Sequence, residues 1–566
     1  MQSTPEVIHA LRELAILLEF SRAPRFKVKA YQRAAEVVAV VGDLGPLVEQ
    51  GRLEDLEGIG ASLSAQIQEL WNTGSSEYLQ RLRSEQPPGT SELAQVEGVT
   101  PMRLRTLIEG LGVRSVAELR EACAQGRVRE LPRFGKATEA RLLEACDRWL
   151  GRVEEGPAPT LLSRALDRAG RLQAALLEVT ERVELAGAVR RGEETVRELE
   201  FVVLGDADAA LSHVSRLRQV LRVDASARRA YLSEGLELRV HPATAANWGT
   251  TLLLATGNDA HLAALSRRAA ARGFALQGPA PVRAFESEAA LYAALDLSYV
   301  PPELRSGAHE LEQAEAQDFG DLISERDIRG LVHCHTTYSD GQNSVLEMAQ
   351  AAHALGMKYI TITDHSPSAR YANGVGLDRL QAQWDEIAAA QAAVPIRILR
   401  GTEADILADG SLDYPDHVLE QFDVVIASIH ARHRLDRAAM TARLVRALSL
   451  PIFKIWGHGL GRILNHREPI DCDVLAVLDA LSGSRGAIEL NADPHRLDLP
   501  PAWIPAARER NIPFVISVDA HSTRGFDVLR YGTTMARRGG VRRREVLNTE
   551  DAERFLALVR PNGTAP

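Results

Sequence analysis

The stretch RGLVHCHTTYSDG, residues 329–341, joins a short apolar run to three side chains of types that bind metal ions. A short apolar run is consistent with a buried β-strand. His333 and His335 are two residues apart, so in a strand they share one face and can chelate one ion. Asp340 adds a carboxylate just beyond them. The stretch therefore predicts a strand that ends in a metal site.

The C-terminal third repeats this arrangement six more times. Ala- and Leu-rich stretches separate the apolar runs, which is typical of βα units in a parallel sheet or barrel. Strand ends converge on one face of such a barrel. A lone histidine at a strand end is more often structural, but seven such strand ends predict a multinuclear metal site. The six further runs are KYITITDHS (358–366), IRILRGTEADI (396–406), FDVVIASIH (422–430), IFKIWGHGLGR (452–462), GAIELNAD (486–493) and PFVISVDAHS (513–522).

The segments HCHTTYSDG, TDHS, GTEADI, SIH, GHGLGR and SVDAHS resemble the motifs of the PHP (polymerase and histidinol phosphatase) domain. The resemblance implies a distorted (β/α)7 barrel that hydrolyses phosphoesters with two or three ions, Mn²⁺, Zn²⁺ or both. The ligand types alone leave Mn²⁺, Zn²⁺ and Fe²⁺ open. Arg462 is a candidate catalytic phosphate clamp, and a surface cation is an equally good interpretation. The resemblance implies nine metal ligands: His333, His335, Asp340, His365, Glu403, His430, His458, Asp519 and His521.

Three glycine-centred turns between helical stretches occur near the N-terminus. They lie in LEDLEGIGASLSAQIQEL (53–70), VEGVTPMRLRTLI (96–108) and LPRFGKATEARLL (131–143). In a helix–hairpin–helix, glycine permits a tight turn and exposes backbone N–H groups at a helix start. Such a cradle binds DNA phosphates without reading base sequence. The residues predicted to bind DNA are Gly58, Gly60, Gly98 and Gly135, with Lys27, Lys29 and Arg33 from the acid-free run 22–33.

The stretch AGAVRRGEETVRELEFVV, residues 186–203, resembles the nucleotidyltransferase palm of family X DNA polymerases. The resemblance implies polymerase-type catalytic carboxylates at Glu198, Glu200 and Glu237, where the family has Asp. Because Glu is one methylene longer, we expect polymerase activity that is impaired or dependent on Mn²⁺, with Mg²⁺ or Mn²⁺ as the palm ion. A solvated strand face is the alternative. The implied nucleotide-binding residues are Gly187, Ala188, Arg191, Gly192, Thr256 and Gly257.

The order of these segments is similar to that of bacterial family X polymerases over nearly the whole chain. We therefore expect a multidomain α/β protein with helical hairpin domains, an α+β palm, a thumb and a PHP barrel. The predicted boundaries are 1–85 for the N-terminal helical domain, 86–152 for a fingers-like hairpin domain, 153–244 for the palm, 245–305 for the thumb, 306–325 for a linker, and 326–566 for the barrel.

Composition sets weaker limits. The apolar content of 45% and the charged content of 25% are ordinary for a soluble protein. The net charge of −10 argues weakly against nucleic acid, but local cation clusters matter more. No apolar run is long enough to span a bilayer, and the N-terminal residues do not resemble a signal peptide. Four scattered cysteines fit a reduced cytoplasm, and we expect a monomer that does not bind membranes.

The function predicted from these features is DNA repair. We expect a PHP 3′→5′ exonuclease that acts on gapped, nicked or structured DNA. The resemblance also permits abasic-site cleavage or 3′-phosphate removal, together with weak template-dependent gap filling from dNTPs. Lyase chemistry is not expected, because Gln66 stands where the family has a Schiff-base lysine. The alternatives are a small-molecule phosphatase of the histidinol phosphatase type and a palm that serves as a non-catalytic scaffold.

Overall fold

The computed structural model divides the chain into two compact units, Met1–Ala158 and Pro159–Pro566. No helix in the described part of the chain is long and apolar enough to cross a membrane. The structure describes residues 4–562 except 22, 42–43, 50, 57, 74–75, 88, 95, 97, 155–158, 218–219, 225, 233–234, 279–280, 308 and 317–318.

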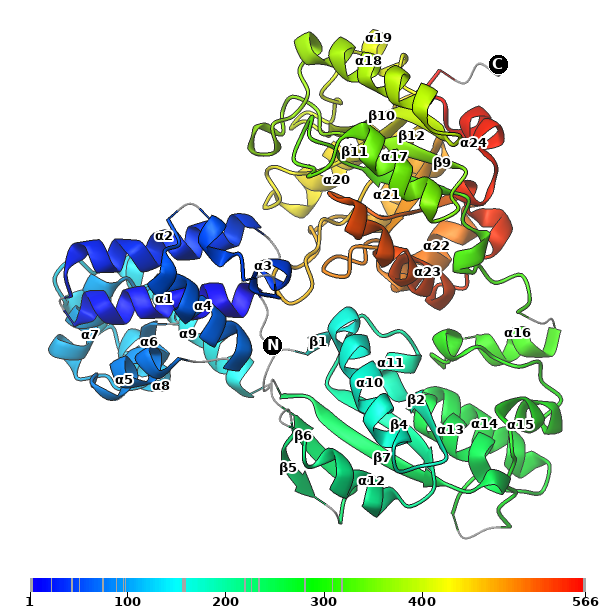
Figure 1. Ribbon diagram of the computed structural model, residues 1–566, viewed down its shortest axis with the longest axis horizontal. Helices are drawn as coiled ribbons and strands as arrows, with labels where there is room; N and C mark the ends of the chain where they lie inside the picture. The colour runs from blue at the N-terminus through cyan, green and yellow to red at the C-terminus, as the bar shows by residue number, and fades with distance from the viewer. Residues whose placement is uncertain are drawn as a thin grey trace. The chain divides into compact units, whose positions relative to one another are not determined.

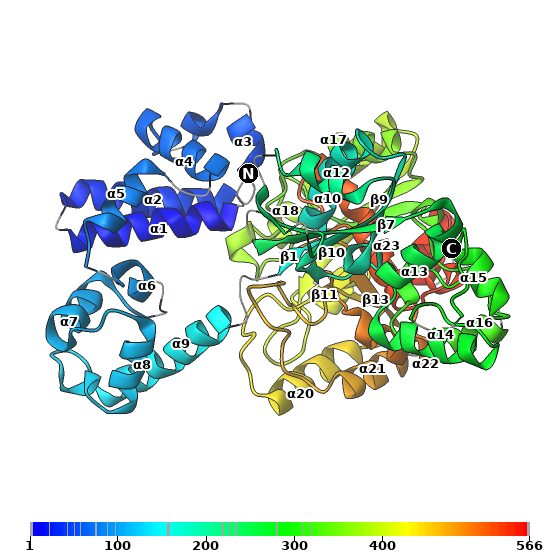
Figure 2. The ribbon, with the colours of Figure 1, turned by 90° about the horizontal axis from the view of Figure 1, so that it is seen from below.

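The first unit contains two helical bundles (Figures 1 and 2). Two buried cores, one spanning Val7–Leu82 and the other Leu93–Cys146, correspond to the two hairpin domains expected from the sequence. Phe20 at the end of the first helix packs against the second core. The helices are α1 (Thr4–Phe20), α2 (Arg25–Val41), α3 (Gly45–Glu49), α4 (Ala61–Thr73), α5 (Glu77–Ser84), α6 (Thr90–Ala94), α7 (Pro101–Leu111), α8 (Val116–Ala124) and α9 (Lys136–Glu154), with 3₁₀ turns at Leu53–Asp55 and Val128–Glu130.

All three predicted hairpins contain the same tight turn, but glycine does not occupy the same position of the turn in each. Gly58 and Gly98 have φ angles of 88° and 87°, whereas the corresponding residue of the third hairpin is Arg133, with φ of 68°. Gly135 instead takes the position of Gly60, just before the second helix. In each turn a backbone N–H bonds to the carbonyl three residues earlier: Ile59 to Leu56 (3.0 Å), Val99 to Val96 (3.1 Å) and Phe134 to Leu131 (3.1 Å).

The second unit begins with a five-stranded sheet in the order β2-β4-β7-β6-β5. Strands β4 and β7 are parallel and the other pairs are antiparallel. The helix α10 packs on this sheet and supplies much of its buried core. The elements are β1 (Thr160–Leu161), α10 (Leu162–Leu177), β2 (Arg182–Ala186), α11 (Gly187–Arg190), β3 (Thr195–Val196), β4 (Glu198–Leu204), α12 (Ala207–Val214), β5 (Val220–Asp224), β6 (Arg229–Leu232) and β7 (Glu237–Ala243).

A small helical region follows the sheet. Its core includes Leu253, Leu265 and Leu291, and it also includes Ala314 and Phe319 from the segment expected to be a linker. The segment was expected to be a linker, but a buried hydrogen-bond contact between His261 Nδ1 and Glu310 Oε1 (2.7 Å) ties it to the helices. The elements are α13 (Trp248–Thr256), α14 (Asp259–Ala271), α15 (Glu288–Ala294) and α16 (Glu310–Ala316).

The C-terminal region is a seven-stranded parallel barrel in the order β14-β13-β12-β11-β10-β9-β8. The ends of β8 and β14 close it, because Val518 N–H bonds to Val332 O (3.2 Å) and His335 N–H bonds to Ala520 O (2.9 Å). Helices surround the strands (Figure 1). The strands are β8 (Gly330–Cys334), β9 (Tyr359–Ile362), β10 (Arg397–Asp405), β11 (Val424–Ser428), β12 (Lys454–Trp456), β13 (Gly486–Asn491) and β14 (Phe514–Ser517).

The barrel is filled at one end and polar at the other. Val332, Leu399, Ile426 and Val515 form an interior cluster with residues of the last helix, α24 (Ala552–Val559). The outward-facing apolar residues pack against the surrounding helices. Those helices are α17 (Val345–Ala354), α18 (Leu377–Ala393), α19 (Asp416–Leu419), α20 (Arg437–Leu448), α21 (Val474–Ser482), α22 (Ile504–Glu509) and α23 (Leu529–Arg538).

Replacing Gly98 with Ala should loosen the second hairpin. A side chain in the left-handed region costs about 1–2 kcal/mol. Gly135→Ala is the matched control, because Gly135 has no left-handed φ and an added Cβ would meet no atom within 4 Å. Hydrogen exchange of the α7 and α9 amides, measured by mass spectrometry, should show faster exchange for Gly98→Ala. Equal exchange in the two variants would contradict the assignment of the turn.

Candidate metal centre

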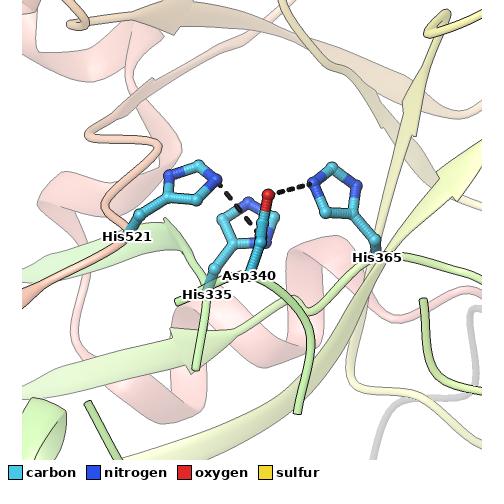
Figure 3. A group of neighbouring side chains, drawn as sticks. All are labelled: His335, Asp340, His365 and His521. Atoms are coloured by element: carbon cyan, nitrogen blue, oxygen red, sulfur yellow. Dashed lines mark ion pairs between the residues drawn. The ribbon is translucent and has the colours of Figure 1, made fainter. Parts of the chain in front are cut away.

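The seven barrel strands bring the predicted ligand side chains to one end of the barrel. Asp340 lies 3.6 Å from His365 (Oδ2 to Nε2) and 3.4 Å from His521 (Oδ1 to Nε2). His335 lies beneath it, with its Nδ1 3.7 Å from Asp340 Oδ1. Figure 3 shows these four side chains directed toward one another; His335 and Asp340 come from the segment after β8, whereas His365 and His521 come from two other segments. This convergence was expected from the sequence, because the strand ends of a parallel barrel meet on one face.

Glu403 is the acidic side chain around which the remaining imidazoles gather. It is buried to 1% exposure on β10, and its carboxylate approaches five imidazole rings from four other segments, because His333 and His335 both come from β8 and the residue after it. The nitrogen–oxygen distances are His458 Nε2 2.8 Å, His365 Nδ1 2.9 Å, His430 Nε2 3.2 Å, His333 Nε2 3.4 Å and His335 Nε2 3.7 Å.

Among the residues that the structure describes, three sets of donor atoms are compact enough to hold an ion. Within each set the donor atoms lie within 4.8 Å of one another. Because His335 and His365 each belong to two sets, the three sets are contiguous. The sets are His335 with Asp340, His365 and His521; His333 with His335 and Asp519; and His365 with Glu403 and His430.

Several of these buried donor atoms have no hydrogen-bond partner. They include Nε2 of His333 and Nε2 of His335, whose nearest carboxylate oxygens each lie 3.4 Å away. A buried polar atom without a partner costs about 1–3 kcal/mol. If divalent cations bind to these donor atoms, the cost of burying the atoms without partners is removed. Imidazole nitrogens and carboxylate oxygens together suit Mn²⁺ and Zn²⁺, so the donor set fits divalent ions.

Three acidic residues orient the donors, and sequence reasoning did not assign them that role. Glu489 Oε1 lies 2.5 Å from Nδ1 of His333, and Asp405 Oδ1 lies 2.5 Å from Nδ1 of His430. Each contact fixes an imidazole with its Nε2 toward Glu403. Asp364 accepts hydrogen bonds at 2.7 Å from the Thr336 backbone and hydroxyl, and so holds the loop that carries Asp340. All three stand at strand ends, which was the available signal.

Three of the converging residues have unusual backbone conformations. His333, Asp519 and His458 have φ angles of 66°, 48° and 25°. A residue other than glycine adopts a positive φ angle at a cost of order 1–3 kcal/mol, and such backbone strain clusters at functional sites. The turn at His333 also interrupts the register between β8 and β9. The strain directs the side chains out of the strand path and into the common space.

Burial and neighbouring charges shift the pKa values of the cluster in different directions. Burial, followed by the nearby His521 and His365, lowers the pKa of His335 to about 4, so its ring is neutral at pH 7. Burial opposes protonation of His365, but Glu403 and Asp340 outweigh it and raise the pKa to about 10. Burial likewise opposes ionisation of Glu403, but His430 and His333 hold its pKa well below the usual value. A divalent ion would displace the proton of His365.

Comparisons with known proteins agree with this architecture. The helix-hairpin-helix domain family matches residues 2–76, and a SAM-like helix-hairpin-helix tandem family matches residues 90–148. The DNA polymerase beta thumb family matches residues 251–306, and the PHP domain family matches residues 332–492. The chain is 33% identical over 570 residues to the DNA polymerase/3'-5' exonuclease PolX of Bacillus subtilis (strain 168), covering 97% of this chain and 99% of the relative.

The chain belongs to the family X DNA polymerases that carry a PHP domain. Other relatives match a smaller part of the chain. A probable phosphatase of Caldanaerobacter subterraneus is 28% identical over 210 residues, which is 35% of this chain and 78% of that protein. A probable phosphatase of Acetivibrio thermocellus is 35% identical over 100 residues, which is 17% of this chain and 39% of that protein. The resemblance stated from the sequence is therefore confirmed at the level of family and fold.

In this family X chain the three palm glutamates share one face of the sheet but are paired with basic side chains. Glu198 and Glu237 are opposite each other on β4 and β7. The three described sets of metal donors do not include these glutamates. The pairs are Glu198 with Arg239 (3.1 Å), Glu200 with His241 (2.8 Å) and Glu237 with Arg229 (3.3 Å). Arg239 and His241 follow Glu237 at two-residue spacing, so strand alternation was a signal for this arrangement.

The residues expected to bind a nucleotide are engaged in protein contacts. A Cβ at Gly187 would collide with the carboxylate of Glu200, so that carboxylate lies against the glycine. A Cβ at Gly192 would collide with the methyl group of Thr534 on α23. Arg191 donates to Thr256 O at 2.7 Å, which ties the turn to the end of α13. Gly257 follows Thr256, and the adjacent Asn258 caps α14 by accepting from His261 N–H. Ala188 packs beside the sheet core.

Arg462 does not lie ready to clamp a phosphate. Its side chain is buried, donates to Leu497 O and pairs with Glu194 Oε1 at 2.5 Å. Glu194 belongs to the family X palm, so Arg462 joins the barrel to the palm. The surface-cation alternative also does not describe it, because the side chain is 8% exposed. The sequence could not reveal this pairing, because 268 positions separate the partners.

The predicted DNA-contacting residues of the first unit lie on its surface or in its turns. Lys29 is exposed, and Lys27 is half-buried with its Nζ 4.6 Å from the centre of the Tyr78 ring. Arg33 is exposed and approaches Gly58, whose added Cβ would lie 3.2 Å from Arg33 Nε. Gln66 lies on α4 with a buried amide oxygen.

Arg462 and Glu194 should show coupled effects on stability. Breaking a buried ion pair by removing one partner costs about 3 kcal/mol or more. Urea unfolding of Arg462→Met, Glu194→Gln and the double variant should give a coupling energy of about 1–3 kcal/mol. The exposed pair Arg437–Asp471, 3.0 Å apart, is the control and should contribute under about 1 kcal/mol. Additive losses would contradict the bridging role of Arg462.

Proposed function

We propose that this protein is a DNA repair enzyme whose main activity is metal-dependent 3′→5′ exonuclease hydrolysis at the barrel centre. The observation that carries the proposal is the buried carboxylate of Glu403 among imidazoles from separate strands, with donor atoms that lack partners. The nine ligands implied by the PHP resemblance are proposed as the metal ligands. Two or three ions, Mn²⁺, Zn²⁺ or both, are the proposed cofactors.

The chemistry is hydrolysis of the last phosphodiester bond. A water oxygen bonds to phosphorus, the bond from phosphorus to the 3′ oxygen of the preceding nucleotide breaks, and that oxygen takes a proton. The products are a nucleoside 5′-monophosphate and a DNA chain shorter by one nucleotide. When bound, the divalent ions lower the pKa of the water and neutralise charge on the phosphate oxygens. Glu403 and Asp519 are ionised and supply the negative charge that balances such ions.

DNA, in place of a small phosphate ester, is the proposed substrate. The three repeated hairpin turns support backbone binding, because each presents a helix start behind a tight turn. The full-length relative from Bacillus subtilis is named a DNA polymerase and 3'-5' exonuclease. The proteins named probable phosphatases match no more than 38% of this chain. We propose sequence-independent binding of gapped, nicked or structured DNA by a monomer.

For the palm we propose weak polymerase activity, or activity that depends on Mn²⁺. Arg239 and Arg229 offset the charge of Glu198 and Glu237 that would attract a catalytic cation, and the ring of His241 contacts Glu200 Oε2 at 2.8 Å. The carboxylate of Glu200 lies where a triphosphate would approach Gly187, and two anions there repel. A palm that binds DNA without catalysis is the limiting case of this proposal.

Removing barrel ligands should abolish exonuclease activity and metal binding together. Purified His333→Ala and Glu403→Ala proteins should hold fewer divalent ions by elemental analysis and fail to shorten a 5′-labelled primer-template in Mn²⁺. Asp405→Ala, which removes the partner of His430, should lower metal affinity about 10- to 100-fold. Glu198→Gln is the matched control and should retain both properties.

Two results would count against the exonuclease proposal. One is primer shortening that persists in His333→Ala. The other is hydrolysis of histidinol phosphate by the wild-type protein with no effect on DNA, which would favour the phosphatase alternative.

Primer extension should be weak in the wild-type protein and stronger in Mn²⁺ than in Mg²⁺. We expect little extension with dNTPs in the His333→Ala background, which removes competing degradation. Changing Glu198, Glu200 and Glu237 together to Asp should move each carboxylate back toward its strand by about one methylene. Because a displacement of about 1 Å can change a rate by about 100-fold, the rate of primer extension should rise in this variant. Efficient extension by the unmodified palm in Mg²⁺ would contradict the proposal, as would extension that survives Glu198→Ala.

A further inference from the structure

Tyr371 lies beside the imidazoles of the candidate metal centre, and most of its surface is exposed. Its exposed fraction is 71%, yet its ring centroid is 6.0 Å from that of His365 and 6.2 Å from that of His430. Single exposed aromatic residues are ordinary on protein surfaces. This one differs because it contacts two of the imidazoles that surround Glu403. An open aromatic face directly beside a phosphodiester site is suited to stacking on a nucleobase.

The loop that carries Tyr371 is held firmly in place. Val375 N–H bonds to His365 O at 2.7 Å, which closes the loop at its base. Ser368 bonds to Asp413 through its backbone N–H (2.6 Å) and its hydroxyl (2.5 Å). Gly374 packs so closely on the loop backbone that a side chain there would collide with the carbonyl of residue 366. The loop that carries the ring is therefore already ordered before a ligand binds, so little conformational entropy is lost when the ring contacts the ligand.

Two arginines lie near the same site. Arg496 Nε is 3.7 Å from Oδ2 of Asp519, and Arg467 Nε donates to Gly461 O at 2.7 Å. Burial, and then the charge of Arg496, lowers the pKa of Arg467, as expected for two guanidinium groups that repel each other. Tyr371 interacts electrostatically with both guanidinium groups. Cations beside an aromatic face match the alternation of phosphate and base in single-stranded DNA.

We propose that Tyr371 stacks on the base of the 3′-terminal nucleotide and thereby selects an unpaired DNA end for hydrolysis at the metal centre. This inference rests on the proposed exonuclease function and adds its preferred substrate. Stacking on Tyr371 requires the terminal base to leave the duplex, so a frayed or single-stranded 3′ end is the better substrate. Arg467 and Arg496 attract the backbone phosphates of the same strand.

The test compares two single-stranded oligonucleotides that differ in the terminal base. One ends in an ordinary 3′ nucleotide and the other in a stable tetrahydrofuran nucleotide that lacks the base. Base–aromatic stacking contributes about 1–3 kcal/mol, so the wild-type kcat/KM in Mn²⁺ should fall about 5- to 150-fold when the base is absent. Tyr371→Ala should lose a similar factor on the ordinary end and lose nothing more on the base-free end. Tyr371→Phe and Tyr371→Trp should retain activity.

Leu377→Ala is the matched control. Leu377 is 58% exposed at the start of α18, six positions after Tyr371, and its truncation should change neither substrate. Binding provides a readout apart from activity. In EDTA, the wild-type protein should quench a 3′-terminal 2-aminopurine, and Tyr371→Ala should not, whereas an internal 2-aminopurine should respond equally to both proteins.

The outcomes separate this role from the exonuclease proposal. Equal losses on both oligonucleotides in Tyr371→Ala would show that the residue only supports the loop, and no loss on either would exclude stacking. Each result would overturn the inference while leaving the exonuclease intact. A wild-type protein that shortens neither oligonucleotide would overturn the exonuclease proposal, and with it the role of Tyr371.

Discussion

The second unit depends on a carboxylate that cannot be buried alone. Glu403 is 1% exposed on a central barrel strand, and an isolated ionised carboxylate in such a position would be very costly. The imidazoles around it, brought by other strands, offset its charge and require cations to satisfy their own lone pairs. Barrel closure between β8 and β14 is what places those imidazoles within reach. The barrel fold and the chemistry of the candidate metal centre therefore both depend on the charge of Glu403.

The barrel separates its stabilising and reactive ends. Aliphatic side chains and α24 fill one end, where Phe555 and Val559 are fully buried. The opposite end contains left-handed backbone at His333 and Asp519, which a polypeptide adopts only when the surrounding structure forces it. The apolar end provides the packing energy that offsets this strain. The residues of the metal centre are thus positioned by parts of the barrel that touch no substrate.

The palm and barrel share more than a connecting segment. Tyr531 and Met535 on α23 lie in the same buried cluster as the palm sheet. Gly192 packs against that helix, and Arg462 pairs with Glu194. Residues that family resemblance associates with nucleotides therefore stabilise an interface between domains. A turn used in this way is less free to close on a triphosphate, which is consistent with the substituted carboxylates of the palm.

The amino-acid sequence by itself indicated the barrel strand ends that carry candidate metal ligands, the three hairpins and the family. These features depend on local patterns, such as the spacing of His333 and His335 or apolar runs that end in ligands, and local patterns survive without coordinates. Only the tertiary structure decided the partners of Arg462 and Glu310 and the left-handed turn at Arg133. Those outcomes depend on charge pairing across long sequence separations and on backbone geometry imposed by packing, which no local pattern encodes.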